Sequence, residues 1–112
     1  MQEYKVILTW EAIYDVTDIS DYIEAKFGKN RADRFQEDIK KEMEQLGYIG
    51  GGFPKTRILY RNYEIHKKSF PPSVIFYIML EEQREVHVLR VLREQRNWRK
   101  ILGKTKSYTY PT

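Results

Sequence analysis

Basic side chains gather near the end of the chain, beside a stretch of alternating valines. The segment Glu85–Leu102 begins with Val86, Val88 and Val91, a β-branched pattern that predicts a strand in the middle of a sheet. Its second half carries five cations: Arg90, Arg93, Arg96, Arg99 and Lys100. Guanidinium groups pair with carboxylates and phosphates. The segment therefore indicates an anionic partner at one edge of the sheet, without indicating a particular reaction.

The charge of the whole chain is unevenly distributed. The formal net charge is +4, but residues 1–48 hold 7 Lys/Arg against 11 Asp/Glu and residues 49–112 hold 13 against 5. The first part is thus near −4 and the second near +8. A basic half of this kind suits nucleic acid or an acidic protein, and it equally suits a solvated surface with no dedicated partner.

The sequence offers no pattern for metal or cofactor chemistry. It has no cysteine, and its two histidines, His66 and His87, lack the spacing of a zinc site. We expect His66 to be exposed on a strand and His87 to be structural. Asp15, Asp18 and Asp21 step by three without a histidine, so we interpret them as a solvated helix face. No cofactor and no metal are expected.

A membrane protein is also not indicated. The longest apolar run is Val74–Leu80, far short of the ~20 residues that span a bilayer. The segment Met1–Trp10 lacks a cationic stretch followed by an apolar one, so no signal peptide is expected. We therefore expect a soluble cytoplasmic protein.

Two amphipathic helices are predicted in the first half. Thr9 is a natural N-cap for the first helix, and Gly28 ends it. Asn30 is predicted to cap the second helix after a linker of about three residues, which gives an antiparallel helical hairpin. The apolar stripes of the two helices are Ala12, Val16, Ile19, Ile23 and Phe27, and Ala32, Phe35, Ile39, Met43 and Leu46.

Strands dominate the second half. Gly47 and Gly50-Gly51-Gly52 are expected to break the second helix and form a flexible connector. The period then changes to that of strands, and one short helix follows. Two short extended segments, Ile58–Tyr60 and Tyr63–Lys68, form either one interrupted strand or a small hairpin. Strands are predicted at Val74–Leu80 and Val86–Leu92, and a helix at Asn97–Leu102.

The element order predicts an α+β fold in one domain, residues 1–103, with a polar C-terminal tail, residues 104–112. An N-terminal strand at Tyr4–Leu8 precedes the helical hairpin, which packs on one face of a mainly antiparallel sheet of about four strands. The short C-terminal helix follows. We expect the other sheet face, with Arg90 and Tyr77, to meet water or a partner, and the tail to be loose.

Three segments, in this order, resemble the RelE/ParE superfamily of toxins from bacterial type II toxin–antitoxin systems. They are YKVILTWEAIYDVTDISDYI, RADRFQEDIKKEMEQL, and SFPPSVIFYIM followed by VHVLRVLREQRNW. The resemblance covers roughly residues 4–102. It implies a small toxin that a cognate antitoxin, encoded beside it, neutralises. RelE-like members cut mRNA on the ribosome, whereas ParE-like members poison DNA gyrase.

The first hypothesis is a RelE-like mRNA endoribonuclease. Cleavage needs a base, an acid and cations near the phosphate. The catalytic candidates would be Arg61, Arg93 and Arg96, with Tyr77 or Tyr108 for stacking or proton transfer. Two departures from the family pattern weaken the nuclease hypothesis. Ser73 lies before the central strand, where RelE-like nucleases carry Arg. Arg93-Glu94-Gln95-Arg96 replaces a frequent His-X-X-Arg, so the neutral base that the histidine would supply is missing.

The second hypothesis, which we favour, is ParE-like poisoning of DNA gyrase. The Lys-Ser-Phe-Pro turn and the Arg93-X-X-Arg96 pair are more similar to this branch. Trp98 is expected to pack the last helix on the sheet more than to stack on a base. The candidate contacts with nucleic acid or the target are Lys55, Arg57, Arg90, Arg93, Arg96, Trp98 and Tyr77. A third reading is an inactive relative that only binds an antitoxin.

Overall fold

The predicted order of helices and strands is confirmed. A computed structural model describes residues 3–111, so the ends of the predicted domain and tail, residues 1, 2 and 112, lie outside the described residues. The elements are β1 (Lys5–Leu8), α1 (Trp10–Phe27), α2 (Lys29–Ile49), a 3-10 turn η1 (Gly50–Gly52), β2 (Lys55–Tyr60), β3 (Tyr63–Phe70), β4 (Ser73–Leu80), β5 (Glu85–Arg93) and α3 (Trp98–Lys104). The α+β class is likewise confirmed.

The two long helices form the predicted hairpin, but their connection is tighter than expected. The Thr9 hydroxyl accepts a hydrogen bond from the Ala12 N–H (3.0 Å) and caps α1 as predicted. Gly28 is the single residue between the helices, with φ 96° and ψ 168°, a region that favours glycine. The predicted three-residue linker and the Asn30 cap are therefore wrong, because one glycine reverses the chain and α2 starts at Lys29.

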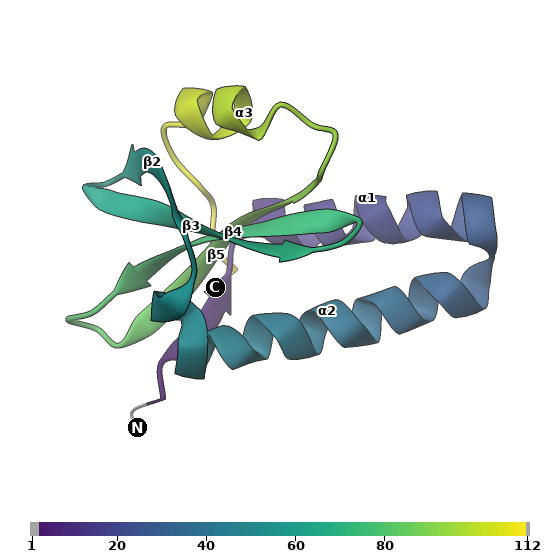
Figure 1. Ribbon diagram of the computed structural model, residues 1–112, viewed down its shortest axis with the longest axis horizontal. Coiled ribbons are helices and arrows are strands. Elements are labelled where there is room, and N and C mark those ends of the chain that lie inside the picture. Colours follow the sequence, from purple (N-terminus) through teal and green to yellow (C-terminus); the bar gives the residue numbers. More distant parts are fainter. Residues whose placement is uncertain (1–2, 112) are drawn as a thin grey trace.

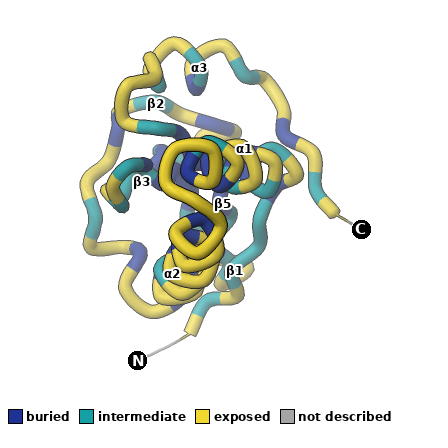
Figure 2. The backbone as a smooth tube through the Cα atoms, turned by 90° about the vertical axis from the view of Figure 1, so that its right-hand side faces the viewer, coloured by how far each residue is buried: buried dark blue, intermediate teal, exposed yellow. Residues whose placement is uncertain are grey.

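The apolar stripes of the hairpin face the sheet. All five predicted stripe positions of α2 are buried, and so are Ala12, Ile19 and Ile23 of α1. Phe27 at the end of the α1 stripe is 57% exposed, because the hairpin projects beyond the sheet (Figure 1). Seen along the hairpin, buried positions line the side that meets the sheet and exposed ones face outward (Figure 2).

The sheet has five strands in the order β1-β5-β4-β3-β2, one more than the predicted four or so. β1 pairs with β5 in parallel, and the other neighbours are antiparallel, so the sheet is mixed. The extra strand arises because β2 and β3 form a separate hairpin with a tight turn at Arg61 and Asn62. β4 and β5 lie in the middle, as their apolar sequences predict.

The second sheet face is covered, so the prediction that it meets water is wrong. A register shift pairs Phe76 with Arg90 and Tyr77 with Val88, which leaves Leu89 as a bulge residue. The bulge directs Leu89 into a second core and Arg90 toward α1. α3 and the tail supply much of that core, which contains Tyr60, Ile65, Phe76, Ile78, Leu89, Leu92, Leu102 and Tyr108.

The tail up to Pro111 packs on the domain, and the prediction of a loose tail is wrong for these residues. The Trp10 N–H donates to the Thr109 carbonyl (2.8 Å). The Thr109 N–H and hydroxyl both donate to the Glu11 carboxylate (2.9 Å each). Tyr108 is only 5% exposed and contacts Tyr60 edge to face. The tail thus joins the start of α1 to the second core.

Gly47 does not break the second helix, contrary to prediction, whereas the helix does end at the Gly50–Gly52 run, as predicted. α2 continues through Gly47 to Ile49, and Gly50–Gly52 add a 3-10 turn. A Cβ on Gly47 would lie 2.4 Å from the Tyr4 carbonyl oxygen, so a glycine is required where β1 approaches the helix.

None of the helices in the described residues, 3–111, has the length and apolar character needed to cross a membrane.

Candidate functional site

Arg93 lies where the last strand leaves the sheet. It pairs with Ser73 across β4 and β5, and its guanidinium carbon is 3.8 Å from the centre of the Tyr22 ring. This stacking on an α1 tyrosine holds the cation in place. Its Nε is buried and has no hydrogen-bond partner in the described part of the chain. Arg93 therefore retains an unused donor beside an open groove.

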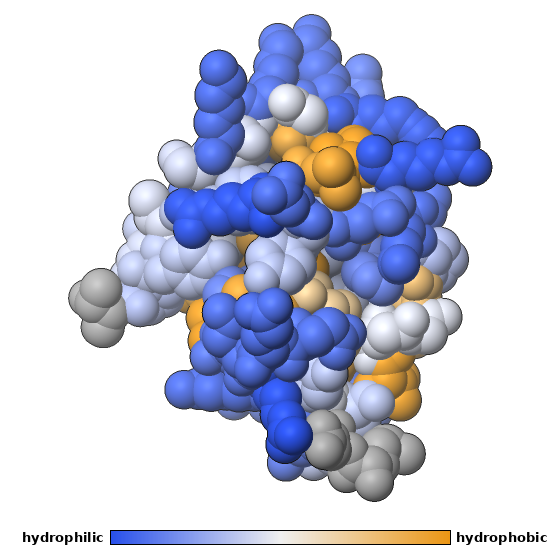
Figure 3. Space-filling view, turned by 90° about the vertical axis from the view of Figure 1, so that its left-hand side faces the viewer, coloured by the Kyte–Doolittle hydropathy of each residue, from blue (hydrophilic) through white to orange (hydrophobic). Residues whose placement is uncertain are grey.

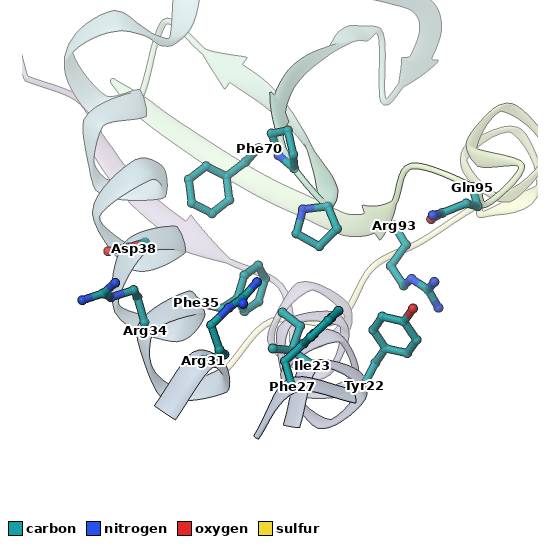
Figure 4. A pocket seen from close by; sticks show the side chains of 12 residues that line it. Tyr22, Ile23, Phe27, Arg31, Arg34, Phe35, Asp38, Phe70, Arg93 and Gln95 are labelled. Atoms are coloured by element: carbon teal, nitrogen blue, oxygen red, sulfur yellow. The ribbon is translucent and has the colours of Figure 1, made fainter. Parts of the chain in front are cut away.

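The groove runs between the far half of the helical hairpin and the β3–β4 turn, and its volume is about 430 Å³ (Figure 4). Its wall contains aromatic and apolar side chains from both helices and from the turn, including Phe35 and Phe70. Arg31 and Arg34 come from α2 on one side and Arg93 from β5 on the other, with Asp38 as the acidic lining residue. The groove thus joins an apolar floor to an arginine rim.

Arg90 does not join this rim, because it is held in an internal ion pair. Its Nε and a terminal nitrogen donate to the two Asp15 oxygens at 2.6 and 2.9 Å, and the Val91 N–H donates to Asp15 at 2.9 Å. Burial raises the pKa of the Asp15 carboxyl, and the hydrogen bonds from Arg90 and Val91 oppose that shift. The solvated-face prediction is therefore wrong for Asp15, while Asp18 is exposed.

Arg96 lies in the loop after β5 and is exposed. It lines a shallow hollow together with Arg93, Tyr22, Asp15 and Asp18. Arg93 and Arg96 are therefore brought together, as their sequence spacing predicts. Arg93 and Arg96 therefore lie at the end of the sheet beside the first helix of the helical hairpin, α1.

The other cationic candidates lie elsewhere on the sheet. Lys55 and Arg57 are exposed on β2, the edge strand farthest from β1, and Arg57 has φ 69° at an irregularity in the β2–β3 pairing. Arg61 occupies the β2–β3 turn. Because β3 and β4 are antiparallel and about eight residues long, this turn lies at the opposite end of the sheet from Arg93. The structure does not bring Arg61 together with Arg93 and Arg96.

The two candidate tyrosines are enclosed. Tyr77 is 0% exposed, stacks on His66 and donates its hydroxyl proton to the Gly50 carbonyl (2.5 Å). Burial raises the pKa of the Tyr77 hydroxyl above its usual range. Burial also raises the pKa of Tyr108. Both hydroxyls therefore stay protonated at neutral pH and lie within the cores, away from the arginine rim.

Both histidines make internal hydrogen bonds. His66 is 5% exposed, so its predicted exposure is wrong, and its Nδ1 lies 3.0 Å from the Phe53 carbonyl oxygen. A carbonyl only accepts, so Nδ1 carries the proton. His87 lies between the Tyr110 hydroxyl (2.8 Å) and the Glu85 carboxylate (2.9 Å), which agrees with its predicted structural role. Neither lines the groove or the hollow beside Arg93 and Arg96.

Trp98 starts α3 and packs against Phe76 with 5.3 Å between ring centres, so the predicted packing of the last helix on the sheet is confirmed.

Within residues 3–111, no group of three or more histidine, cysteine or acidic side chains is arranged to hold a metal ion.

The sequence reasoning missed the groove residues Tyr22, Arg31 and Arg34, which the helical hairpin supplies, and Phe70 at the end of β3. The spacing of Arg31, Arg34 and Asp38 around Phe35 does place them on one side of α2. That signal was available. What the sequence lacked was the position of the β3–β4 turn opposite them.

Comparisons with known proteins agree with this fold. The family model described as the ParE toxin of the type II toxin–antitoxin system parDE matches residues 6–98. A solved structure, described as the chromosomal ParDE TA system from P. aeruginosa, is similar to this chain with a TM-score of 0.69 and 17% identity. The match covers 81% of this chain and 96% of that one, and it shows a shared fold. No curated protein gives a significant match.

Proposed function

Because this chain belongs to the ParE toxin family of type II toxin–antitoxin systems, we propose that it stops growth in the cytoplasm by binding and poisoning DNA gyrase. An antitoxin is the partner that such a system supplies. Poisoning of DNA gyrase is the activity that the resemblance to ParE-like members implies. The proposal assigns Arg93 and Arg96 to the contact with the target.

One observation supports contact over cleavage. The half-buried Arg93 and the exposed Arg96 lie together, while both histidines are used in hydrogen bonds elsewhere. General acid–base cleavage of RNA needs a titratable group within hydrogen-bond reach of the reacting oxygen. Cations alone supply charge complementarity to an acidic protein surface or to phosphate. The site is therefore better suited to binding than to catalysis.

The groove suits the antitoxin. Its apolar floor can accept apolar side chains, and Arg31, Arg34 and Arg93 can pair with carboxylates. We expect the antitoxin to lay an acidic and apolar segment along it, across the basic and helical surfaces. An antitoxin bound there would cover Arg93 and so block the proposed target contact.

The test combines a double variant with two readouts. Arg93→Ala with Arg96→Ala should abolish growth inhibition and gyrase-dependent DNA cleavage. The variant should stay folded and should still bind antitoxin in a pull-down, because Arg31, Arg34 and the apolar floor of the groove remain. Lys40→Ala with Lys41→Ala, which removes two exposed cations from α2, is the matched control and should stay toxic. Full toxicity of a stably expressed Arg93/Arg96 variant would contradict the assignment.

Pulse labelling after induction separates the targets. Under the proposal, DNA synthesis falls before protein synthesis and the cells filament. If protein synthesis falls first, the gyrase proposal is wrong and the ribosome-dependent mRNA endoribonuclease takes its place. If neither falls, the chain is an inactive relative.

A further inference from the structure

A second cleft, apart from the arginine-rimmed groove, opens at the edge of β3. β2 pairs with β3 only as far as Lys55 opposite His66, and the Lys67 N–H bonds to Pro54 just before β2. Beyond Lys67, no strand of the described chain pairs with this edge of β3. The cleft there has a volume of about 380 Å³ and is lined by Phe53, Pro54, Lys67, Lys68, Ser69 and Trp98. The function proposed above uses none of these residues, although the sequence had made Trp98 a candidate contact.

Aromatic rings hold cations in place around this cleft. The Lys67 ammonium lies 5.1 Å from the Trp98 ring centre, and the Arg99 guanidinium carbon lies 4.4 Å from it. The Lys68 ammonium lies 5.1 Å from the Phe53 ring centre and is also paired with Glu42. Cation–π contacts of this kind restrict long side chains that otherwise move freely.

The charge at the cleft is largely uncompensated. Among the residues that the structure describes, Lys67, Arg99 and the nearby Lys55 form no ion pair with a carboxylate. Long hydrophilic side chains crowd the upper part of this side of the molecule, where α3 lies (Figure 3). The cleft therefore has a positive edge beside aromatic walls.

The backbone adds a donor. The Lys67 N–H points out of the β3 edge, where it donates to the Pro54 carbonyl (2.9 Å). Since antiparallel strands alternate the direction of their N–H groups, the Ser69 N–H points from the same edge. No strand covers it in the described part of the chain. A backbone N–H beside two cations is a common arrangement for contacting phosphate.

We propose that this cleft binds single-stranded DNA, with phosphates on Lys67, Arg99 and the Ser69 N–H and an unpaired base against Trp98. Aromatic side chains beside a positive groove are the general means of binding single strands, because every base has a face that can stack. A duplex keeps its bases stacked and cannot offer them to a recessed wall. The choice of DNA over RNA rests on the proposed gyrase function, whose target holds DNA.

The test uses the purified full chain and a short fluorescein-labelled oligothymidylate, with binding followed by anisotropy at several salt concentrations. Trp98→Ala should weaken binding at least about fivefold, the lower end for one stacked base. Lys67→Gln with Arg99→Gln should weaken it as well and make the salt slope shallower by roughly 1.4, at about 0.7 per phosphate contact. Lys40→Gln with Lys41→Gln is the matched charge control and should change nothing.

A spectroscopic readout covers the case in which Trp98→Ala fails to fold, since Trp98 packs on Phe76. With Trp10→Phe in place, Trp98 is the remaining tryptophan, and its fluorescence should be quenched when the oligonucleotide binds. Unchanged fluorescence, or equal loss of binding in the control pair, would overturn the site. Tighter binding of oligouridylate, or of an oligoglutamate peptide, would overturn the assignment to DNA.

The outcome is separable from that of the gyrase proposal. If Lys67→Gln with Arg99→Gln binds DNA normally while the wild-type chain poisons gyrase, only the cleft assignment is wrong. If the cleft binds DNA but the chain does not affect gyrase, only the proposed function is wrong.

Discussion

Replacing Asp15 by alanine should destabilise the protein strongly, although the residue lies in a series that the sequence presents as solvated. The side chains of Asp15 and Arg90 are only 10% and 19% exposed, and Asp15 accepts three hydrogen bonds. The alanine variant leaves Arg90 as a largely buried charge without a partner and the Val91 N–H without its acceptor. Breaking a buried pair in this way costs about 3–5 kcal/mol.

That loss is large for a domain of this size. Domains are stable by roughly 5–15 kcal/mol in total, and about 1 kcal/mol shifts the melting temperature by about 4–8 °C. We therefore expect a fall in melting temperature of at least about 12 °C, together with a lower urea midpoint at an unchanged m value. Partial exposure of Arg90 places the expected loss at the lower end of the range, near 3 kcal/mol.

Two further variants make the test specific. Asp18→Ala, one turn along the same helix and exposed, should stay within about 0.5 kcal/mol of the wild type. Asp15→Leu combined with Arg90→Met removes both charges and should recover most of the lost stability. If Asp15→Ala unfolds at the same urea concentration as Asp18→Ala, the pair is not a buried ion pair and the reasoning is wrong.

Two other predictions concern the contacts that the two ends of the chain make with the rest of the domain. Gly47→Ala should destabilise by about 1–3 kcal/mol, since its Cβ would lie 2.4 Å from the Tyr4 carbonyl oxygen, whereas Gly51→Ala, with no atom within 4 Å of its Cβ, should be nearly neutral in the same urea titration. Burial acts to raise the pKa of Glu11, but the hydrogen bonds from Thr109 outweigh this effect, so the pKa of Glu11 lies below the ordinary glutamate value of 4.5. Glu11 therefore stabilises the fold above about pH 4.5, and this contribution is lost as the pH falls through the lower folded pKa. The difference in unfolding free energy between the wild type and Glu11→Gln should shrink toward zero on acidification; a difference that is constant with pH would contradict the role of this carboxylate.

Local pattern accounts for the elements that the sequence predicted well. The α2 stripe is buried in full because its spacing of three and four residues keeps one side of the helix apolar. Thr9 caps α1 because a hydroxyl before an amphipathic stretch can satisfy an orphan N–H. Both features depend on residues within a few positions of each other.

The errors share a dependence on distant residues. Asp15 is buried because Arg90, 75 positions later, supplies its partner. Arg90 reaches Asp15 of α1 beside a bulge at Leu89 that changes the alternation of β5, and a bulge has no signature in a run of valines and leucines. The tail is ordered because Thr109 finds Glu11, a contact that composition does not reveal.

The candidate site follows the same division. Arg93 and Arg96 are close in sequence and close in space. Their separation from Arg61 follows from strand direction, and their neighbours Tyr22 and Arg31 follow from how the hairpin lies over the β3–β4 turn. Sequence reasoning could identify the cations but not the surface around them.

The pairing of β1 with β5 also determines when the sheet can be completed during synthesis of the chain. β1 has one neighbouring strand in the sheet, and its register joins Lys5 to Glu85 and Leu8 to Val88. A nascent chain that ends before β5 can build the helical hairpin, which depends on local contacts, but it leaves β1 without a partner. Because Arg93 is the last residue of β5, the sheet and the surface that carries Arg93 are completed at nearly the same time. The proposed contact surface for the target therefore forms only once β5 has been synthesised, and a chain that ends before β5 is expected to lack it.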